Sequence, residues 1–142
     1  AAVSDFTVDA QPQKIKRAQQ LNNDMTLTLK PTADILAGIA ERKQPHQRVI
    51  GFAAESENLH TAAQDKLQRK RLDAIIANDI SRSDIGFQSD ENEVTVFLAE
   101  HYHTTETHSP IQLPKQSKTE LARTLLLQLA DTCSPLNTQT LR

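Results

Sequence analysis

Two short apolar runs separated by an amphipathic segment constrain the fold of this 142-residue chain more than any other feature. The first run is Val49–Ala54 and the second is Asp73–Ala77, and both have the near-continuous apolar character of buried strands. Residues 56–71 lie between them and carry helical spacing, with Ser56 as the predicted N-cap and Glu57 in the first turn. A strand, a helix and a strand in this order predict a βαβ unit on a parallel sheet.

A strand and a helix are predicted upstream of this unit. Apolar and polar residues alternate over Asn22–Leu29, which is typical of a half-buried strand. Thr32 follows as the predicted N-cap of a helix that ends near Lys43, before a proline. The rhythm of strand, helix, strand, helix and strand predicts an α/β protein.

The downstream third has a different pattern. Val94–Leu98 is a predicted strand, and a second extended piece at Ile111–Leu113 pairs with it in a predicted hairpin. Ser117 or Thr119 begins the final predicted helix. The polar residues 134–142 are predicted to form a disordered tail.

The composition excludes several classes of protein. A net charge of −2 argues against a general nucleic-acid binder, which would carry a strongly basic balance. The single cysteine, Cys133, has no internal disulfide partner, and no apolar run approaches the roughly 18–20 residues that span a membrane. We therefore expect a cytoplasmic protein. Three well-separated glycines also exclude a Walker or dinucleotide phosphate loop from this chain.

Two lysines on the second predicted helix are out of place. At 100° per residue, Lys66 and Lys70 fall within about 20° of Leu59, in the middle of the stripe expected to face the sheet. Ammonium groups on a buried face are costly without an anionic partner. Two explanations stay open: the lysines extend to solvent near the helix end, or they point over the strand ends at a phosphorylated ligand.

An acidic strand end and a basic run lie near the start of the sequence. Asp5 follows the apolar Ala1–Val3, which has the pattern of the carboxyl end of a strand whose beginning is missing. A carboxylate at that place suits a metal–phosphate complex or a ribose hydroxyl. The basic run Lys14–Arg17 is either solvated, as such runs usually are, or directed at an anion near the same sheet edge.

The histidines and the cysteine give weaker signals. His101, His103 and His108 lie in one polar segment, but their spacing is not an established ligand pattern, so solvated loop histidines are favoured over a metal site. Cys133 continues the apolar face of the last helix and is better explained as a core residue than as a nucleophile.

Six segments occur in the order and near the spacing of one known family. They are AAVSDF, KIKR, LTLKPTADILAGIA, VIGFAAESENL, AQDKLQRKRLDAIIANDIS and GFQSDENEV. Across them, over about Ala1–Phe97, the chain resembles phosphopantothenoylcysteine synthetase (phosphopantothenate–cysteine ligase). In bacteria this synthetase is commonly the C-terminal domain of the bifunctional flavoprotein of coenzyme A synthesis. The final helix fits the family's closing helix more loosely.

The resemblance implies a fold and a place within it. The family fold has three layers and combines Rossmann-like and ribokinase-like topology in a mixed sheet, mostly parallel with an antiparallel hairpin near the C-terminus. Its glycine-rich nucleotide loop lies upstream of Ala1, so residues 1–133 are expected to be the C-terminal part of the synthetase domain, inactive alone. A homodimer is implied, with a higher oligomer and FMN only where an upstream decarboxylase domain is fused.

The resemblance also implies a reaction. The bacterial enzymes require CTP and Mg²⁺, and the carboxylate of 4'-phosphopantothenate attacks the α-phosphate of CTP to give an acyl-cytidylate and pyrophosphate. The amine of L-cysteine then attacks the acyl carbon and expels CMP, which leaves 4'-phosphopantothenoylcysteine. Both steps build negative charge on oxygen atoms, so the chemistry needs positioned cations and a metal.

Carried over to this sequence, the family's first site residues fall near its start. Ala1, Ala2 and Asp5 match the nucleotide-contacting strand end, with Asp5 near the Mg²⁺–triphosphate. Lys14 matches the first lysine of a flexible loop that acts in the cysteine-dependent step. The loop before it is about one residue shorter than in relatives, which leaves Lys16 as the alternative.

The remaining site residues follow the same correspondence. Phe52 matches a phenylalanine beside the cytidine, and Lys66 and Lys70 match helix lysines at the nucleotide. A loop bordering the nucleotide is matched by Lys30, Pro31, Thr32 and Ala33. The rival hypothesis is a non-catalytic α/β module that binds a nucleotide or a protein partner through the same basic edge.

Overall fold

The computed structural model describes residues 4–10, 12–14, 25–82, 84, 89–103 and 109–133. The chain divides into two compact units, Ala1–Ile35 and Leu36–Arg142. Several sequence-based predictions lie outside the described residues: Ala1, Ala2, Lys16, His108 and the tail 134–142.

The described part of the first unit contains a small antiparallel ribbon. Strand β1 (Phe6–Thr7) pairs with β2 (Lys30–Pro31), so that Phe6 lies opposite Pro31 and Thr7 opposite Lys30. The predicted strand Asn22–Leu29 is wrong over its described part, because residues 25–29 are not in a strand. Alternation gives an extended segment one apolar side but supplies no partner strand, and the apolar side chains there are about half exposed.

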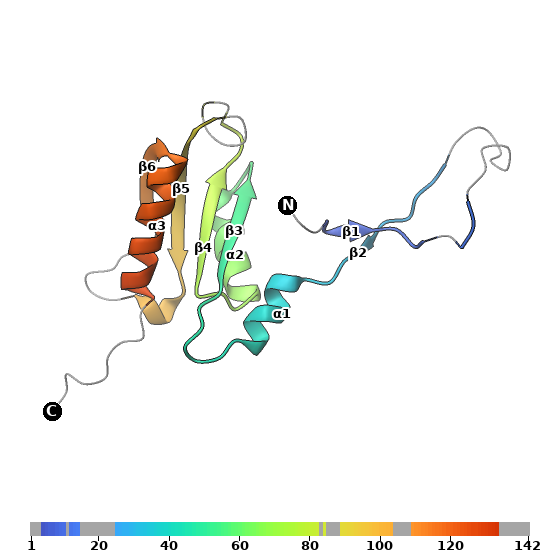
Figure 1. Cartoon of the computed structure of the whole chain (residues 1–142), viewed down its shortest axis with the longest axis horizontal. Helices are drawn as coiled ribbons and strands as arrows, with labels where there is room; N and C mark the ends of the chain where they lie inside the picture. The colour runs from blue at the N-terminus through green and yellow to red at the C-terminus, as the bar shows by residue number, and fades with distance from the viewer. Residues whose placement is uncertain are drawn as a thin grey trace. The chain divides into compact units, whose positions relative to one another are not determined.

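The second unit contains a four-stranded mixed sheet in the order β3-β4-β5-β6, seen at the centre and left of Figure 1. Strands β3 (Ile50–Glu55) and β4 (Ala74–Asp79) are parallel, as the predicted βαβ unit requires. Strand β5 (Glu91–Leu98) runs antiparallel to β4 and forms the predicted hairpin with β6 (Ile111–Ser117). Parallel pairing in the described sheet is therefore confined to β3 and β4.

Helices cover both faces of this sheet. Helix α2 (Leu59–Arg69) and residues 36 and 40 of α1 (Ile35–Arg42) pack on the face that carries Ile75 and Phe97. Helix α3 (Lys118–Thr132) packs on the opposite face, and its core contacts extend to Cys133. The three-layer α/β architecture is confirmed, and within the described residues no helix has the length and apolar character needed to cross a membrane.

Of the predicted N-caps, the one of α3 is confirmed and those of α1 and α2 are wrong. Ser117 caps α3, and its side chain accepts a hydrogen bond from the backbone N–H of Glu120. Ser56 is not the cap of α2, which is preceded instead by Asn58 in the left-handed conformation that asparagine tolerates. Thr32 does not cap α1, because its hydroxyl donates to the Ser4 carbonyl within the first unit.

Candidate functional site

The carboxyl ends of β3 and β4 form the edge at which open α/β sheets bind ligands. The strands end in register, with Ala54 opposite Asn78 and Glu55 opposite Asp79. Helix α2 begins a few residues after β3, so its first turn lies beside the same edge. Two carboxylates, one on each strand, therefore flank the candidate site.

Glu55 holds the first of the two helix lysines. The Lys66 ammonium forms an ion pair with the Glu55 carboxylate, although the two groups belong to different elements. Helical side chains lean toward the helix N-terminus, and this brings Lys66 back toward the end of β3. The Lys66 side chain is 36% exposed and that of Glu55 is 17% exposed. Without a ligand, the anionic partner of this lysine is thus a protein carboxylate.

The predicted placement of Lys66 at the centre of the buried face is wrong. Ala63 is fully buried and Leu67 is buried, and they fall at about 40° and 80° from Leu59 on the helical wheel. The face that packs on the sheet is therefore rotated away from Lys66. Lys70 follows the last residue of α2, is half-buried and falls between Leu59 and Ala63 on the wheel, so it stays at the packed face while Lys66 lies at its margin.

Phe52 is the most exposed large apolar side chain in the described structure, at 72%. It belongs to β3, which is an edge strand of the described sheet. Because successive side chains of a strand point to opposite faces, Phe52 lies on the other face of β3 from Glu55 and its partner Lys66. Phe52 and Lys66 therefore both lie beside β3, but on opposite faces of that strand.

The end of β4 carries site features that the sequence did not single out. Asp79 accepts hydrogen bonds from the Ser81 hydroxyl at 2.6 Å and the Ser81 N–H at 2.9 Å, and these lower the pKa of the Asp79 carboxyl. A cavity of about 190 Å³ opens here, lined in part by Leu59, His60, Asp79 and Arg82. The signal available beforehand was position alone, because Asp79 ends a buried strand.

The first unit brings together two predicted site segments that are far apart in the sequence. The Thr32 N–H donates to the Asp5 carbonyl at 2.9 Å. The Lys30 ammonium pairs with the Asp9 carboxylate at 2.5 Å. Asp5 and the segment of Lys30, Pro31 and Thr32 therefore belong to one β-ribbon, as neighbouring walls of a site require. Lys14 and Ala33 are exposed.

Comparisons with known proteins identify relatives of this chain. The DNA/pantothenate metabolism flavoprotein C-terminal domain family matches residues 1–132. The coenzyme A biosynthesis bifunctional protein CoaBC of Bacillus subtilis (strain 168) is 36% identical over 132 residues, which are 92% of this chain and 30% of the relative. The CoaBC protein of Escherichia coli (strain K12) is 40% identical over 98 residues, which are 68% of this chain and 24% of the relative.

A solved structure supports the same relationship. The crystal structure of the C-terminal domain of a CoaBC protein superposes with a TM-score of 0.60 and 29% sequence identity, over 94% of this chain and 52% of that one. This chain spans under a third of the length of the two full-length relatives. Because the family match extends over residues 1–132, the chain belongs to the DNA/pantothenate metabolism flavoprotein C-terminal domain family.

Proposed function

We propose that this chain supplies the C-terminal part of a ligase domain in coenzyme A biosynthesis. The reaction condenses 4'-phosphopantothenate with L-cysteine through an acyl-cytidylate, at the expense of CTP, and gives 4'-phosphopantothenoylcysteine, CMP and pyrophosphate. The observation that carries the proposal is the family match over residues 1–132, with coenzyme A biosynthesis proteins as relatives. The geometry of the strand ends is compatible with it.

Phe52 is proposed to lie against the cytosine ring. An aromatic ring that is 72% exposed at a strand edge gains little from the protein core. Stacking on a nucleobase covers such a ring and contributes about 1–3 kcal/mol per base in nucleic-acid complexes. A nucleotide placed there would lie along the edge of β3.

Lys66 and Lys70 are proposed to bind the phosphates. Glu55 neutralises Lys66 in the chain without ligand. A triphosphate carries several negative charges and would compete with this single carboxylate for the ammonium group. Developing charge on the α-phosphate would then lie within reach of cations that are already positioned.

The ribbon of the first unit is proposed to hold the Mg²⁺–triphosphate. Within the described residues, no three histidine, cysteine, aspartate or glutamate side chains form a metal cluster. Asp5 offers one exposed carboxylate, which fits Mg²⁺ because this ion is commonly held by one or two carboxylates together with substrate phosphates. When bound, Mg²⁺ would neutralise phosphate charge, while Lys30 and the Thr32 backbone fix the ribbon that carries Asp5.

Lys14 is proposed to act in the cysteine-dependent step. Its ammonium is exposed and would neutralise charge on the acyl-cytidylate as the cysteine amine displaces CMP. In the full-length protein that contains this sequence, Lys14→Gln is expected to let acyl-cytidylate accumulate while product formation collapses. Rapid-quench analysis with radiolabelled CTP measures both species. Lys118→Gln, on the exposed start of α3, is the matched control, and unchanged turnover in Lys14→Gln would remove the assigned role.

A non-catalytic nucleotide- or protein-binding module is the second candidate, favoured by the Glu55–Lys66 pair, which gives this lysine an anionic partner without a ligand. Calorimetric titration of CTP and ATP, with and without Mg²⁺, separates the two functions. The ligase proposal expects a preference for CTP that depends on Mg²⁺, whereas equal binding of both nucleotides favours the module. The homodimer also stays a prediction, and light scattering tests it.

A further inference from the structure

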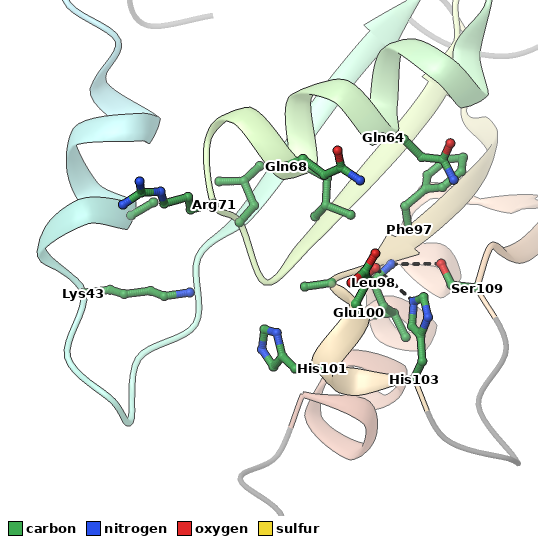
Figure 2. Close-up of a pocket in the computed structure, with 14 residues that line it drawn as sticks. Lys43, Gln64, Gln68, Arg71, Phe97, Leu98, Glu100, His101, His103 and Ser109 are labelled. Carbon is green, nitrogen blue, oxygen red and sulfur yellow. Dashed lines mark hydrogen bonds between the residues drawn. The ribbon is translucent and has the colours of Figure 1, made fainter.

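A second cavity lies at the opposite end of β4 from Asp79 and the candidate site. It measures about 590 Å³ and adjoins Leu72, which precedes β4, and Leu98, which ends β5. Its walls come from segments distant in sequence: Lys43 between α1 and β3, the last turns of α2, and the connection between β5 and β6. Figure 2 shows side chains of α2 and of this connection on opposite sides of the cavity, with Lys43 entering from a separate loop.

The β5–β6 connection is bonded to this end of the sheet through its first residues, 99–103. It spans residues 99–110, whereas hairpin loops usually have about 2–5 residues. The Ala99 N–H donates to the Asp73 carbonyl at 2.9 Å, and the Tyr102 hydroxyl donates to the Asp73 carboxylate at 2.9 Å. These bonds fix the segment that contributes His101 and His103 to the cavity wall.

Arg71 is held in a conformation that normally selects glycine. Its φ of 53° is left-handed, and the Leu72 N–H donates to the Leu67 carbonyl at 3.0 Å, the bond that closes a Schellman motif. Any side chain with a Cβ is strained there relative to glycine. Within the described residues, the guanidinium of Arg71 makes no ion pair, so its side chain contributes lining to the cavity without a partner in the fold.

The floor and the rim of the cavity have different chemistry. Lys43 is a second cation, and its bond to the Asp73 carboxylate uses one of its three ammonium donors. Asp73 itself is buried and saturated by donors, so Glu100 is the exposed carboxylate of the wall. The floor is apolar and consists of Leu67, Leu72, Phe97 and Leu98.

We propose that this cavity binds a small organic monoanion, a carboxylate with a short apolar chain. Arg71 and Lys43 bind the carboxylate, and the chain covers the apolar floor. Glu100 disfavours a second negative charge in the ligand, which selects a monoanion over a dianion. The site is independent of the nucleotide edge and of the proposed ligase reaction.

Hexanoate is the probe, titrated into the whole chain and followed by two-dimensional amide NMR. Saturable shifts are expected around the cavity, and hexanol and inorganic phosphate are expected to bind at least about tenfold more weakly, because each lacks one half of the recognition. Hexanol that bound as tightly as hexanoate would overturn the proposal.

Arg71→Gly tests the anchor without endangering the fold, because glycine relieves the left-handed strain. The variant is expected to melt no lower than the parent chain and to lose at least about tenfold in hexanoate affinity. Arg69→Gln is the matched control, since Arg69 is an exposed cation on the same helix that does not line the cavity. If Arg71→Gly binds hexanoate as tightly as the parent chain, Arg71 does not bind the anion. The same conclusion holds if Arg71→Gly and Arg69→Gln lose the same amount of hexanoate affinity.

Discussion

Replacing Asp73 by asparagine is expected to lower the free energy of unfolding by about 3 kcal/mol. The Asp73 side chain is 2% exposed, and its Oδ2 atom accepts bonds from the Lys43 ammonium at 2.6 Å and the Val49 N–H at 2.7 Å. Its Oδ1 atom accepts from the Tyr102 hydroxyl at 2.9 Å. One carboxylate thus ties together the segments before β3 and β4 and the segment after β5.

The magnitude follows from what asparagine leaves behind. An amide has one oxygen, so its NH₂ group faces donors and the Lys43 ammonium loses its counter-charge. Removing one partner of a buried ion pair costs about 3–5 kcal/mol, and the lower end applies because the Lys43 side chain is 26% exposed and regains water. Against a typical total of about 5–15 kcal/mol, this loss is large.

Urea denaturation followed by far-ultraviolet circular dichroism measures this loss. Asp73→Asn is expected to lower the transition midpoint with an unchanged slope, since the same surface is exposed on unfolding. Asp65→Asn, on the exposed face of α2, is the control and should change stability by no more than about 0.5 kcal/mol. A similarly small effect of Asp73→Asn would refute the assignment of this carboxylate as a structural centre.

Acid titration tests the same carboxylate in a second way. Burial alone would raise the pKa of Asp73, but hydrogen bonds from Lys43, Val49 and Tyr102 lower it below its ordinary value of 3.8. A depressed pKa in the folded state means that the stabilisation is present above pH 3.8 and is lost as the pH falls through the folded pKa. Asp73→Asn should therefore remove part of the acid-dependent loss of stability.

Three further perturbations follow from single contacts. Tyr102 is the only tyrosine in the sequence, and burial together with its carboxylate partner Asp73 raises its pKa to about 12, so absorbance titration should show tyrosinate near that pH in the folded chain and near pH 10 in urea. The stability linked to this pKa is present below pH 10 and is lost as the pH rises. A titration midpoint near pH 10 in the folded chain would contradict the hydrogen bond between Tyr102 and Asp73. Gly51→Ala should lower the unfolding free energy by about 1–3 kcal/mol in urea denaturation, because its Cβ would lie 2.8 Å from Leu72 Cδ1, and an unchanged midpoint would show that Leu72 yields freely. Glu55→Gln should tighten CTP binding in calorimetry by releasing Lys66, and weaker binding would count against a phosphate role for that lysine.

The elements that the sequence predicted correctly depend on local pattern. The apolar runs at β3 and β4 and the leucines of α3 repeat at the periods of their own element, so neighbours in the chain suffice to recognise them. The predicted strand Asn22–Leu29 failed in its described part because a strand also needs a partner, and only Lys30–Pro31 finds one.

The contacts that the sequence did not predict depend on distant residues. The orientation of α2 is set by which side chains meet the sheet, and burial of Leu67 turned the packed face away from Lys66. Asp73 had the appearance of an ordinary residue at a strand start, because its partners Lys43 and Tyr102 are 30 and 29 residues away. The family correspondence located Asp5 and Lys30, whereas their union in one ribbon required the structure.

The most direct test of the ligase proposal is to quantify the products that the full-length protein containing these residues forms. With CTP, Mg²⁺, 4'-phosphopantothenate and L-cysteine, we expect CMP, pyrophosphate and 4'-phosphopantothenoylcysteine in equal amounts, and without cysteine we expect pyrophosphate and bound acyl-cytidylate with little CMP. Chromatography with mass detection measures all four species. Release of CMP that does not depend on cysteine, or no consumption of CTP in the complete mixture, would contradict the proposal.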